Sequence, residues 1–460
     1  MNDDLLLTFY GDDFTGSTDV MEQLEMGGVP TVLFLDVPTP EQFALFPRVK
    51  AVGIAGISRS MTPAQMDAEL PDKFKALAQL GAPFFHYKVC STFDSSPTVG
   101  SIGHAIEIGW QHFQPRIVPL IIGAPFLRRY VIFGNLFARV GEVTYRLDRH
   151  PTMSQHPITP MHEADLRVHL AKQTDRQIGL IDYWHMLSKS PHELDAFVDA
   201  RVADGDQILV FDTMDDDHLT TIGRILWERR QETPIFLVGS SGVERALTLY
   251  LQQSREEVQP SSMKSPGAAS QMIVMSGSAA PGTRDQIQFA LDRGFVGIRL
   301  DVPALIDPAT EENTRMRTIS EAMAVLDQGN SVLLYSALGP DDPIIAQTRQ
   351  HAERIHLSPP ETAQKLGLQQ GRITKALIEQ SGIRRVCIAG GDTSGHTARQ
   401  LGIFALQAIQ TIAPGAPLCH ARSSDPQFDK IEIALKGGQN GFEDYFWAIL
   451  QGKAHQQEVN

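Results

Sequence analysis

The segment that decides the fold class is residues 5–24, LLLTFYGDDFTGSTDVMEQL, where an apolar run leads into a loop with two adjacent acids. The apolar run predicts a buried strand, and the small polar residues after it are typical of the start of a helix. A strand that leads directly into a helix indicates a mostly parallel sheet covered by helices. In such a sheet ligands bind at the carboxyl ends of the strands, so Asp12 and Asp13 are the first candidate site residues.

The same alternation of short apolar runs and helical spacing continues through the chain. Residues 254–271 interrupt it with a polar stretch rich in Ser, Pro and Ala, which predicts a linker. We therefore predict two α/β domains at 1–255 and 270–455, joined by a linker at 256–269. Residues 123–162 have weak periodicity and predict a hairpin or a cap over the first sheet. The runs that predict buried strands are 4–10, 30–36, 50–56, 82–88, 177–183, 207–213, 233–239, 271–277, 296–302, 330–336, 384–391 and 430–438.

The bulk composition argues against several classes of protein. The 460 residues are 42% hydrophobic and 20% charged, a mixture typical of globular proteins. The net charge of -14, without a basic run, argues against nucleic acid or an anionic membrane as partner. The three cysteines form no CxxC pair, so neither a zinc site nor a disulfide framework is expected. Residues 1–13 lack the features of a signal peptide and no apolar stretch reaches about 18 residues, so we expect a cytoplasmic enzyme.

The two adjacent acids have several chemical uses. They could bind the hydroxyls of a polyol, hold Mg²⁺, or accept a proton. Alternatively, Asp12 or Asp13 only caps the following helix, a role that Thr15 or Ser17 can also fill. Two neighbouring acids exceed what capping needs, which favours a functional role.

Cations and hydroxyls follow two other strands of the first domain. Arg59 comes after the third predicted strand, where it could grip a carboxylate with two parallel hydrogen bonds. Together with the acids, this edge suits a small molecule with one anionic end and several hydroxyls, such as a sugar acid. We interpret Cys90 as a packing residue, because no His partner for a nucleophile is evident in the sequence. The fourth predicted strand leads into Lys88, Val89, Cys90, Ser91 and Thr92.

Three glycine-rich units of strand, loop and helix mark the second domain. Glycines let backbone N–H groups approach a phosphate, and the helix start behind them favours negative charge. Three such loops in one domain predict a nucleotide phosphate site, to which Lys436 adds a charge and Asp392 a ligand for Mg²⁺ or for a ribose hydroxyl. Alternatively, Asp392 only caps its helix. The loops contain Ser278 in the first, Gly390, Gly391, Asp392 and Thr393 in the second, and Lys436, Gly437 and Gly438 in the third.

Several familiar motifs are absent from the sequence. It contains neither a GxxxxGK[ST] P-loop nor a GxGxxG dinucleotide fingerprint. The histidines at 150, 156 and 162 are evenly spaced with prolines between them, which is not the spacing of a helical metal site. Asp215, Asp216 and Asp217 predict the solvated start of a helix.

Taken in order, these motifs resemble the four-carbon acid sugar kinase family. The resemblance covers nearly the whole chain, both domains included, and its motifs together are specific although each alone is not. It rests on DDFTGSTD at 12–19, GISR with Arg59, KVCST at 88–92, GSAAPGT with Ser278, GGDT at 390–393 and LKGGQNGFEDYF from 435.

The resemblance implies an ATP-dependent kinase that phosphorylates the terminal hydroxyl of a small sugar acid with Mg²⁺. It implies a substrate domain followed by a nucleotide domain, with the reaction in the cleft between them. Asp12, Arg59 and residues 88–91 would contact the sugar acid, and Ser278, residues 390–393 and Gly438 would contact ATP. Asp12 or Asp13 would accept the proton of the attacking hydroxyl.

The continuation of the KVCST motif bears on the substrate. Threonate and erythronate kinases usually continue with x-Arg-Gly, whereas this chain has Phe93-Asp94-Ser95, which favours the 3-oxo-tetronate type. Gly437 stands where the family usually has Ser, so threonate, erythronate and 3-oxo-isoapionate stay open as substrates. A Mg²⁺-dependent phosphatase and a sugar-acid sensor are the alternative functions, and a homo-oligomer is compatible with the sequence.

Overall fold

The computed structural model describes residues 5–454 except 157, 231–233, 255–258, 261, 262, 264 and 439. It divides into two compact units, Met1–Ser262 and Met263–Asn460. Part of the predicted linker, residues 256–258, 261, 262 and 264, lies outside the described residues. The boundaries at 255 and 270 therefore stay a prediction, whereas the two-domain α/β organisation is confirmed.

The strands of the first unit are parallel and follow the order β2-β3-β1-β4-β11-β5-β10-β9. Every pairing recorded between these neighbours is parallel, so the loops after their carboxyl ends share one edge of the sheet. The strands are β1 (Leu7–Gly11), β2 (Thr31–Phe34), β3 (Ala51–Ala55), β4 (Phe84–Lys88), β5 (Val118–Ile121), β9 (Ile178–Ile181), β10 (Ile208–Phe211) and β11 (Ile235–Gly239).

Helices connect these strands, as parallel pairing requires. The predicted helix after Asp215 is α8, and Asp215 caps it by accepting a hydrogen bond from the His218 N–H. The helices are α1 (Phe14–Met26), α2 (Pro40–Ala44), α3 (Pro63–Ala78), α4 (Ile102–Phe113), α5 (Leu166–Leu170), α6 (Tyr183–Ser188), α7 (Pro191–Ala203), α8 (Asp216–Arg229) and α9 (Gly242–Ser254), with 3₁₀ turns at Ser58–Ser60, Pro125–Leu127, Leu147–Arg149 and Met153–Gln155.

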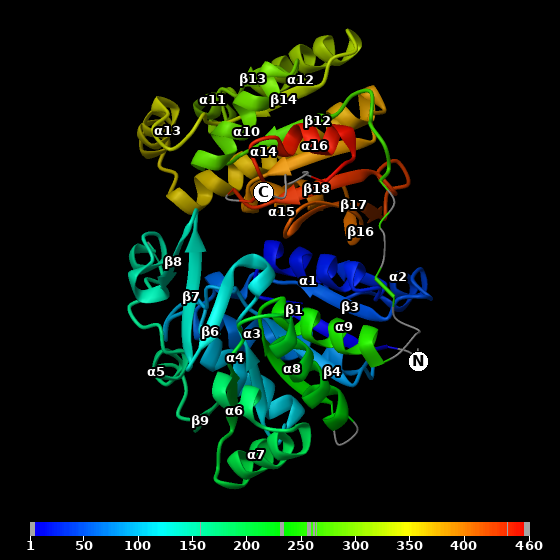
Figure 1. Cartoon of the computed structure of the whole chain (residues 1–460). Coiled ribbons are helices and arrows are strands. Elements are labelled where there is room, and N and C mark those ends of the chain that lie inside the picture. Colours follow the sequence, from blue (N-terminus) through cyan, green and yellow to red (C-terminus); the bar gives the residue numbers. More distant parts are fainter. Residues whose placement is uncertain are drawn as a thin grey trace. The chain divides into compact units, whose positions relative to one another are not determined.

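A separate antiparallel sheet follows β5 and confirms the hairpin predicted within residues 123–162. Its strands are β6 (Arg129–Ile132), β7 (Asn135–Val140) and β8 (Val143–Arg146), in the order β6-β7-β8 (Figure 1). Backbone pairing of Val131 with Thr213 ties this sheet to the loop after β10. We call the β6-β7-β8 sheet the flap.

The strands of the second unit follow the order β13-β14-β12-β15-β18-β17-β16. They are parallel from β13 to β18, whereas β17 runs antiparallel to both of its neighbours. Its strands are β12 (Ile273–Ser276), β13 (Val296–Arg299), β14 (Val332–Tyr335), β15 (Arg385–Ala389), β16 (Ile403–Ala413), β17 (Ala416–Ser423) and β18 (Glu432–Lys436). Its helices are α10 (Pro281–Asp292), α11 (Val302–Ile306), α12 (Glu311–Asp327), α13 (Pro343–Arg354), α14 (Pro359–Ser381), α15 (Gly391–Gln400) and α16 (Tyr445–Gln451).

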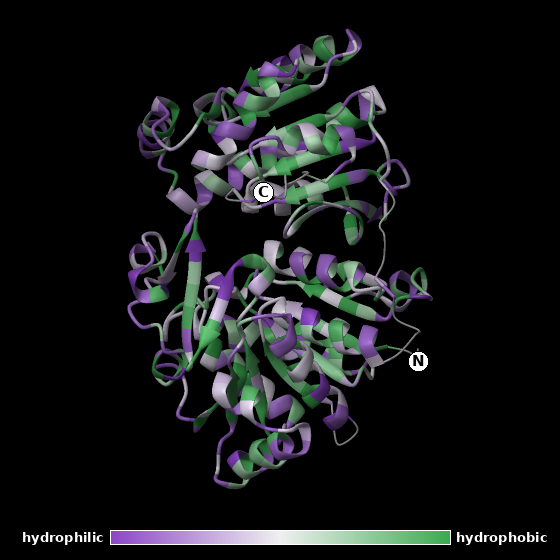
Figure 2. Ribbon diagram, viewed as in Figure 1, coloured by the Kyte–Doolittle hydropathy of each residue, from purple (hydrophilic) through white to green (hydrophobic). Residues whose placement is uncertain are grey.

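The apolar side chains are concentrated along the strands. Figure 2 shows hydrophobic colour along the strands and hydrophilic colour on the outer helices. The strands β1, β2 and β4 are buried at every position, as the apolar runs predicted. Among the described residues, no helix has the length and apolar character needed to cross a membrane.

Candidate active site

Strands β1, β3 and β4 end together and bring the first set of predicted residues to one edge. Gly11 lies opposite Ala55 on one side and Lys88 on the other. The backbone N–H of Asp12 donates to the Lys88 carbonyl at 2.9 Å, and the N–H of Arg59 donates to the Asp12 carbonyl at 2.9 Å. These bonds hold Asp12, Arg59 and Lys88 side by side, as their positions after three strands predicted.

Arg59 is clamped by both acids of the opening segment. Its Nε and Nη2 donate to the two carboxylate oxygens of Asp12 at 3.0 and 2.7 Å, and its Nη1 donates to Asp13 at 2.8 Å. All three nitrogens of the guanidinium group are therefore engaged within the protein. In the structure the fork holds Asp12. The expectation that Arg59 grips a ligand carboxylate stays a prediction.

Burial and charge act on the Asp12 carboxyl in opposite directions. Asp12 is 4% exposed. Burial raises the pKa of Asp12, and this effect exceeds the lowering by the Arg59 charge. A carboxylate whose pKa is raised accepts a proton more readily than an exposed aspartate does.

Asp13 has a local structural role as well. It is the N-cap of α1, and its Oδ1 accepts from the Gly16 N–H at 2.7 Å. Of the residues that could cap this helix, Asp13 does so, as the alternative interpretation of the acids predicted, and Thr15 and Ser17 do not. Both residues lie inside the first turns of α1, whereas Asp13 has the extended backbone that a cap requires.

Lys88 is buried next to an acid that the site prediction left out. Lys88 is 2% exposed, and its Nζ lies 3.9 Å from Oδ2 of Asp19, which is also buried. Oδ1 of Asp19 has no hydrogen-bond partner within the described chain. The signal for Asp19 was present in the sequence, because this acid ends the DDFTGSTD motif at 12–19. The structure adds that residues 16–24 around it are all buried.

The loop after β4 forms a second polar group. Thr92 donates to Oδ1 of Asp94 at 2.5 Å and also lies 2.9 Å from the Cys90 sulfur. Burial raises the pKa of the Cys90 thiol, and the Asp94 charge adds to the effect, so the thiol stays protonated at neutral pH. Burial acts to raise the pKa of Asp94. The charge of Arg59 and the hydrogen bond from the Thr92 hydroxyl act against burial, and the pKa of Asp94 is lowered. Val89 is buried behind this loop and Ser91 is half-buried at its surface.

The glycine loops of the second unit also meet at one edge, because β12, β15 and β18 are neighbours in the sheet. The Thr283 hydroxyl donates to the Gly438 carbonyl at 2.8 Å and lies 3.1 Å from the Ser278 hydroxyl. A Cβ on Gly438 would approach the Ser278 hydroxyl to 2.5 Å. A side chain at position 438 would therefore force the Ser278 side chain or the loops to shift.

The second loop depends on glycine in another way. Gly390 has φ 124° and ψ 131°, a conformation that residues with a Cβ avoid, and it directly precedes α15. The Thr393 hydroxyl donates to the Gln370 side chain at 2.9 Å and points back toward Gly277, whose Cβ would approach it to 2.0 Å. Gly391 begins the helix, with no atom within 4 Å of the place of a Cβ. The side chain of Asp392 lies outside the described part of the structure.

Lys436 is buried at the end of β18 beside these loops. It is 1% exposed, and its Nζ donates to the Thr283 hydroxyl at 3.2 Å and to the Gly437 carbonyl at 2.9 Å. Burial lowers the pKa of Lys436 to about 8. No carboxylate pairs with it among the described residues, so its charge is available to an anion bound at the loops.

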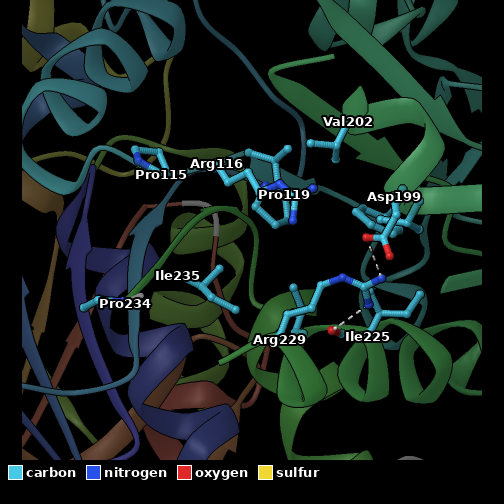
Figure 3. Close-up of a pocket in the computed structure, with 13 residues that line it drawn as sticks. Pro115, Arg116, Pro119, Asp199, Val202, Ile225, Arg229, Pro234 and Ile235 are labelled. Atoms are coloured by element: carbon cyan, nitrogen blue, oxygen red, sulfur yellow. Dashed lines mark hydrogen bonds and ion pairs between the residues drawn. The ribbon is translucent and has the colours of Figure 1, made fainter. Parts of the chain in front are cut away.

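Two further features do not belong to the candidate site. Across the described residues, no three or more His, Cys, Asp or Glu side chains are grouped to hold a metal ion. The pocket of Figure 3 is lined by α7, α8, the residues that begin β5 and β11, including Pro119 and Ile235, and Phe211 of β10. Arg229 in this pocket is already paired with Asp199 at 3.3 Å. The amino ends of parallel strands lie opposite the edge that carries Asp12, so this pocket is a separate feature.

Models of two domain families match the chain. The model described as the sugar-binding N-terminal domain matches residues 7–247. The model described as the nucleotide-binding C-terminal domain matches residues 273–446. The two matches fall on the first and second units in that order.

Two curated relatives match the chain over almost its full length. A 3-oxo-isoapionate kinase of Paraburkholderia graminis is 46% identical over 450 residues, which cover 98% of this chain and 95% of the relative. A 3-oxo-tetronate kinase of Pseudomonas savastanoi pv. phaseolicola is 28% identical over 446 residues, which cover 97% of each chain.

A solved structure shows the same fold. The crystal structure of a Haemophilus influenzae protein matches with a TM-score of 0.75 at 25% identity, over 96% of this chain and 98% of that one. The likeness extends over both units, so the pair of α/β domains is shared throughout.

Proposed function

The chain belongs to the four-carbon acid sugar kinase family, and from this premise we propose that it transfers the γ-phosphate of ATP to the terminal hydroxyl of a 3-oxo sugar acid. The first candidate substrate is 3-oxo-isoapionate, because the relative with that substrate shares far more of its sequence with this chain than the 3-oxo-tetronate kinase does. The sequence motifs alone favoured the 3-oxo-tetronate type, which becomes the second candidate.

The observation that carries the proposal is the buried Asp12 carboxylate at the carboxyl edge of the first sheet. In the reaction the substrate hydroxyl oxygen attacks the γ-phosphorus, the bond to the bridging oxygen of the β-phosphate breaks, and ADP leaves. The hydroxyl proton must go to an acceptor. Asp12 fits this role because burial raises its pKa while both of its oxygens are held in place by Arg59.

The other residues at this edge position Asp12 and bind the substrate. Arg59 fixes the rotamer of Asp12, and Asp13 fixes Arg59 from the start of α1. Lys88 and the polar groups of the loop at 89–92 would contact the hydroxyls of the sugar acid. With these assignments the acceptor is Asp12, and Asp13 is a positioning residue.

The glycine loops of the second unit would bind ATP. Ser278, residues 390–393 and Gly438 offer backbone N–H groups and hydroxyls to the phosphates, and Lys436 offers a buried positive charge. Direct transfer requires the bound sugar acid and the γ-phosphate to meet during turnover.

Mg²⁺ is the expected companion of ATP. Mg²⁺ keeps several waters and takes only one or two carboxylates in addition to phosphate oxygens, so the loops fit it without a preformed cage. Asp392, which directly follows two glycines, is the residue of the loops that would approach it. Bound Mg²⁺ would neutralise charge on the phosphates. Because the reaction needs ATP, we place the protein in the cytoplasm.

A panel of sugar acids tests the proposal. ADP formation is measured by a coupled assay with 3-oxo-isoapionate, 3-oxo-tetronates, D-threonate and D-erythronate, and free phosphate is measured in parallel. The proposal predicts ADP formation that depends on a 3-oxo acid, with phosphate transferred to the acid. Release of free phosphate from a phosphorylated sugar acid, without any use of ATP, would instead identify a phosphatase. Binding of a sugar acid without turnover would identify a sensor.

A further inference from the structure

The edge that carries Asp12 has more acids than available cations. Four carboxyl groups gather there, from Asp12, Asp13, Asp19 and Asp94. The two cations, Arg59 and Lys88, both face acids, Arg59 at 2.7 and 2.8 Å and Lys88 at 3.9 Å. A sugar acid brings a further negative charge to this edge. Its carboxylate therefore needs a cation that is not already engaged.

Arg129, the first residue of the flap, is such a cation. It is half-buried, and its Nη1 is held by the carbonyls of Leu127 at 2.9 Å, Arg128 at 3.2 Å and Arg139 at 3.4 Å. Nε is buried and has no hydrogen-bond partner within the described chain. Among the described residues no acid pairs with Arg129, and its bonds to protein oxygens involve only Nη1.

The free nitrogens have the geometry that a carboxylate needs. Nε and Nη2 lie on the same edge of a guanidinium group and form the fork that binds two carboxylate oxygens in parallel. The three carbonyl contacts on Nη1 orient the group without neutralising it. Burial without a counter-charge lowers the pKa of Arg129, which is the expected sign for an uncompensated cation. Because Nε is covered from solvent, a ligand can bind to it only if the side chain moves outward.

The start of the flap lies beside the carboxyl end of β5. The charge of Arg129 acts on the His150 ring, which follows the flap, and contributes to the lowering of the pKa of that ring. Backbone pairing of Ala124 with Arg129 fixes the start of β6 beside the loop that leaves β5. Because β5 and β4 belong to the same parallel sheet, Arg129 therefore lies at the same edge of the sheet as the residues that follow β4.

We propose that Arg129 binds the carboxylate of the sugar acid through its Nε and Nη2, and that it makes the enzyme select acids over neutral sugars. This inference rests on the proposed function and deepens it. Arg59 then holds the proton acceptor, and Arg129 holds the anionic end of the substrate. The terminal hydroxyl, at the other end of a short sugar acid, is left free to face Asp12.

The test compares an acid with its neutral amide. The ratio of kcat/KM for 3-oxo-isoapionate to kcat/KM for its primary amide is measured for the wild type, Arg129→Met, Arg129→Lys and the control Arg128→Met. Arg128 is exposed and lies next to Arg129 in the chain. Both substrates are measured on the same preparation, so a loss of folded protein cancels in the ratio.

The proposal predicts that Arg129→Met lowers the ratio by about 10- to 100-fold, the range expected for a hydrogen-bonded charge. Arg129→Lys should lower the acid-to-amide ratio less than Arg129→Met does, and Arg128→Met should leave it unchanged. The KM for ATP should not change in any variant. An unchanged ratio in Arg129→Met would overturn the proposal, and a raised KM for ATP with an unchanged ratio would assign Arg129 to the phosphate instead. A wild type that turns over no sugar acid would contradict the proposed function itself, and this inference with it.

Discussion

Replacement of Lys436 by Met should make the second unit more stable at neutral pH while it weakens ATP binding. The folded protein keeps this lysine buried with a pKa of about 8, against an ordinary value of 10.5. A pKa lowered by that much corresponds to a cost of about 3 kcal/mol for the charged form. The unfolded chain stays protonated up to pH 10.5, so the folded state binds fewer protons between pH 8 and 10.5. The contribution of Lys436 to the free energy of unfolding therefore rises as the pH increases from 8 to 10.5.

The measurement is the difference in unfolding free energy between Lys436→Met and the wild type, by calorimetry without nucleotide from pH 7 to 10.5. Lost hydrogen bonds to Thr283 and Gly437 add an offset that is the same at every pH. The difference should fall by about 3 kcal/mol as the pH rises from 8 to 10.5, or roughly 6–12 °C in Tm for a unit of this size. Lys453→Met, at an exposed site in the same unit, should show no such trend. If the difference in unfolding free energy between Lys436→Met and the wild type did not change with pH, the interpretation that Lys436 is buried without a compensating charge would be refuted.

Three further changes test single features of the two units. Asp13→Ala removes the cap of α1 and should lower the unfolding free energy by about 1 kcal/mol in chemical denaturation, whereas Asp13→Asn should retain most of it. Gly390→Ala forces a Cβ into a backbone with φ 124° and should weaken ATP binding in calorimetric titration, and unchanged affinity would contradict the role of that loop. Burial lowers the pKa of the His169 ring to about 4, so the stability that this group contributes is lost as the pH falls from 6.5 to 4. In unfolding experiments over this range, His169→Asn should reduce the loss of unfolding free energy by up to about 3 kcal/mol.

Much of the fold could be predicted from the sequence because buried parallel strands are continuous apolar runs. The segments that became β1, β3, β4, β12 and β15 were recognised in this way, and so was the flap as a hairpin. Strand β5, in the stretch RIVPLIIG, was not predicted, and neither was the antiparallel pair β16 and β17. Strand β16 mixes buried and half-buried positions, and the register of the pair is irregular, so β16 lacks the uniform apolar signal.

The site could be predicted only as far as strand ends determine it. That Asp12, Arg59 and Lys88 come together follows from parallel topology, which the sequence pattern indicates. Which side chain faces which does not follow from the pattern, and the clamp on Arg59 was not foreseen. Arg129 was out of reach for the same reason. Its place at this edge depends on how the flap pairs with the loop after β5, which strand-end reasoning does not describe.

The most direct test of the account is phosphoryl transfer by Asp12→Asn with ATP binding measured on the same sample. Transfer of labelled γ-phosphate to 3-oxo-isoapionate is followed by product mass, and ATP affinity by calorimetric titration. The account predicts that the wild type forms the sugar-acid phosphate, and that the variant forms almost none while its ATP affinity is nearly unchanged. Product formation by the variant at the wild-type rate, or a loss of ATP affinity in its place, would contradict the assignment of Asp12 as the proton acceptor.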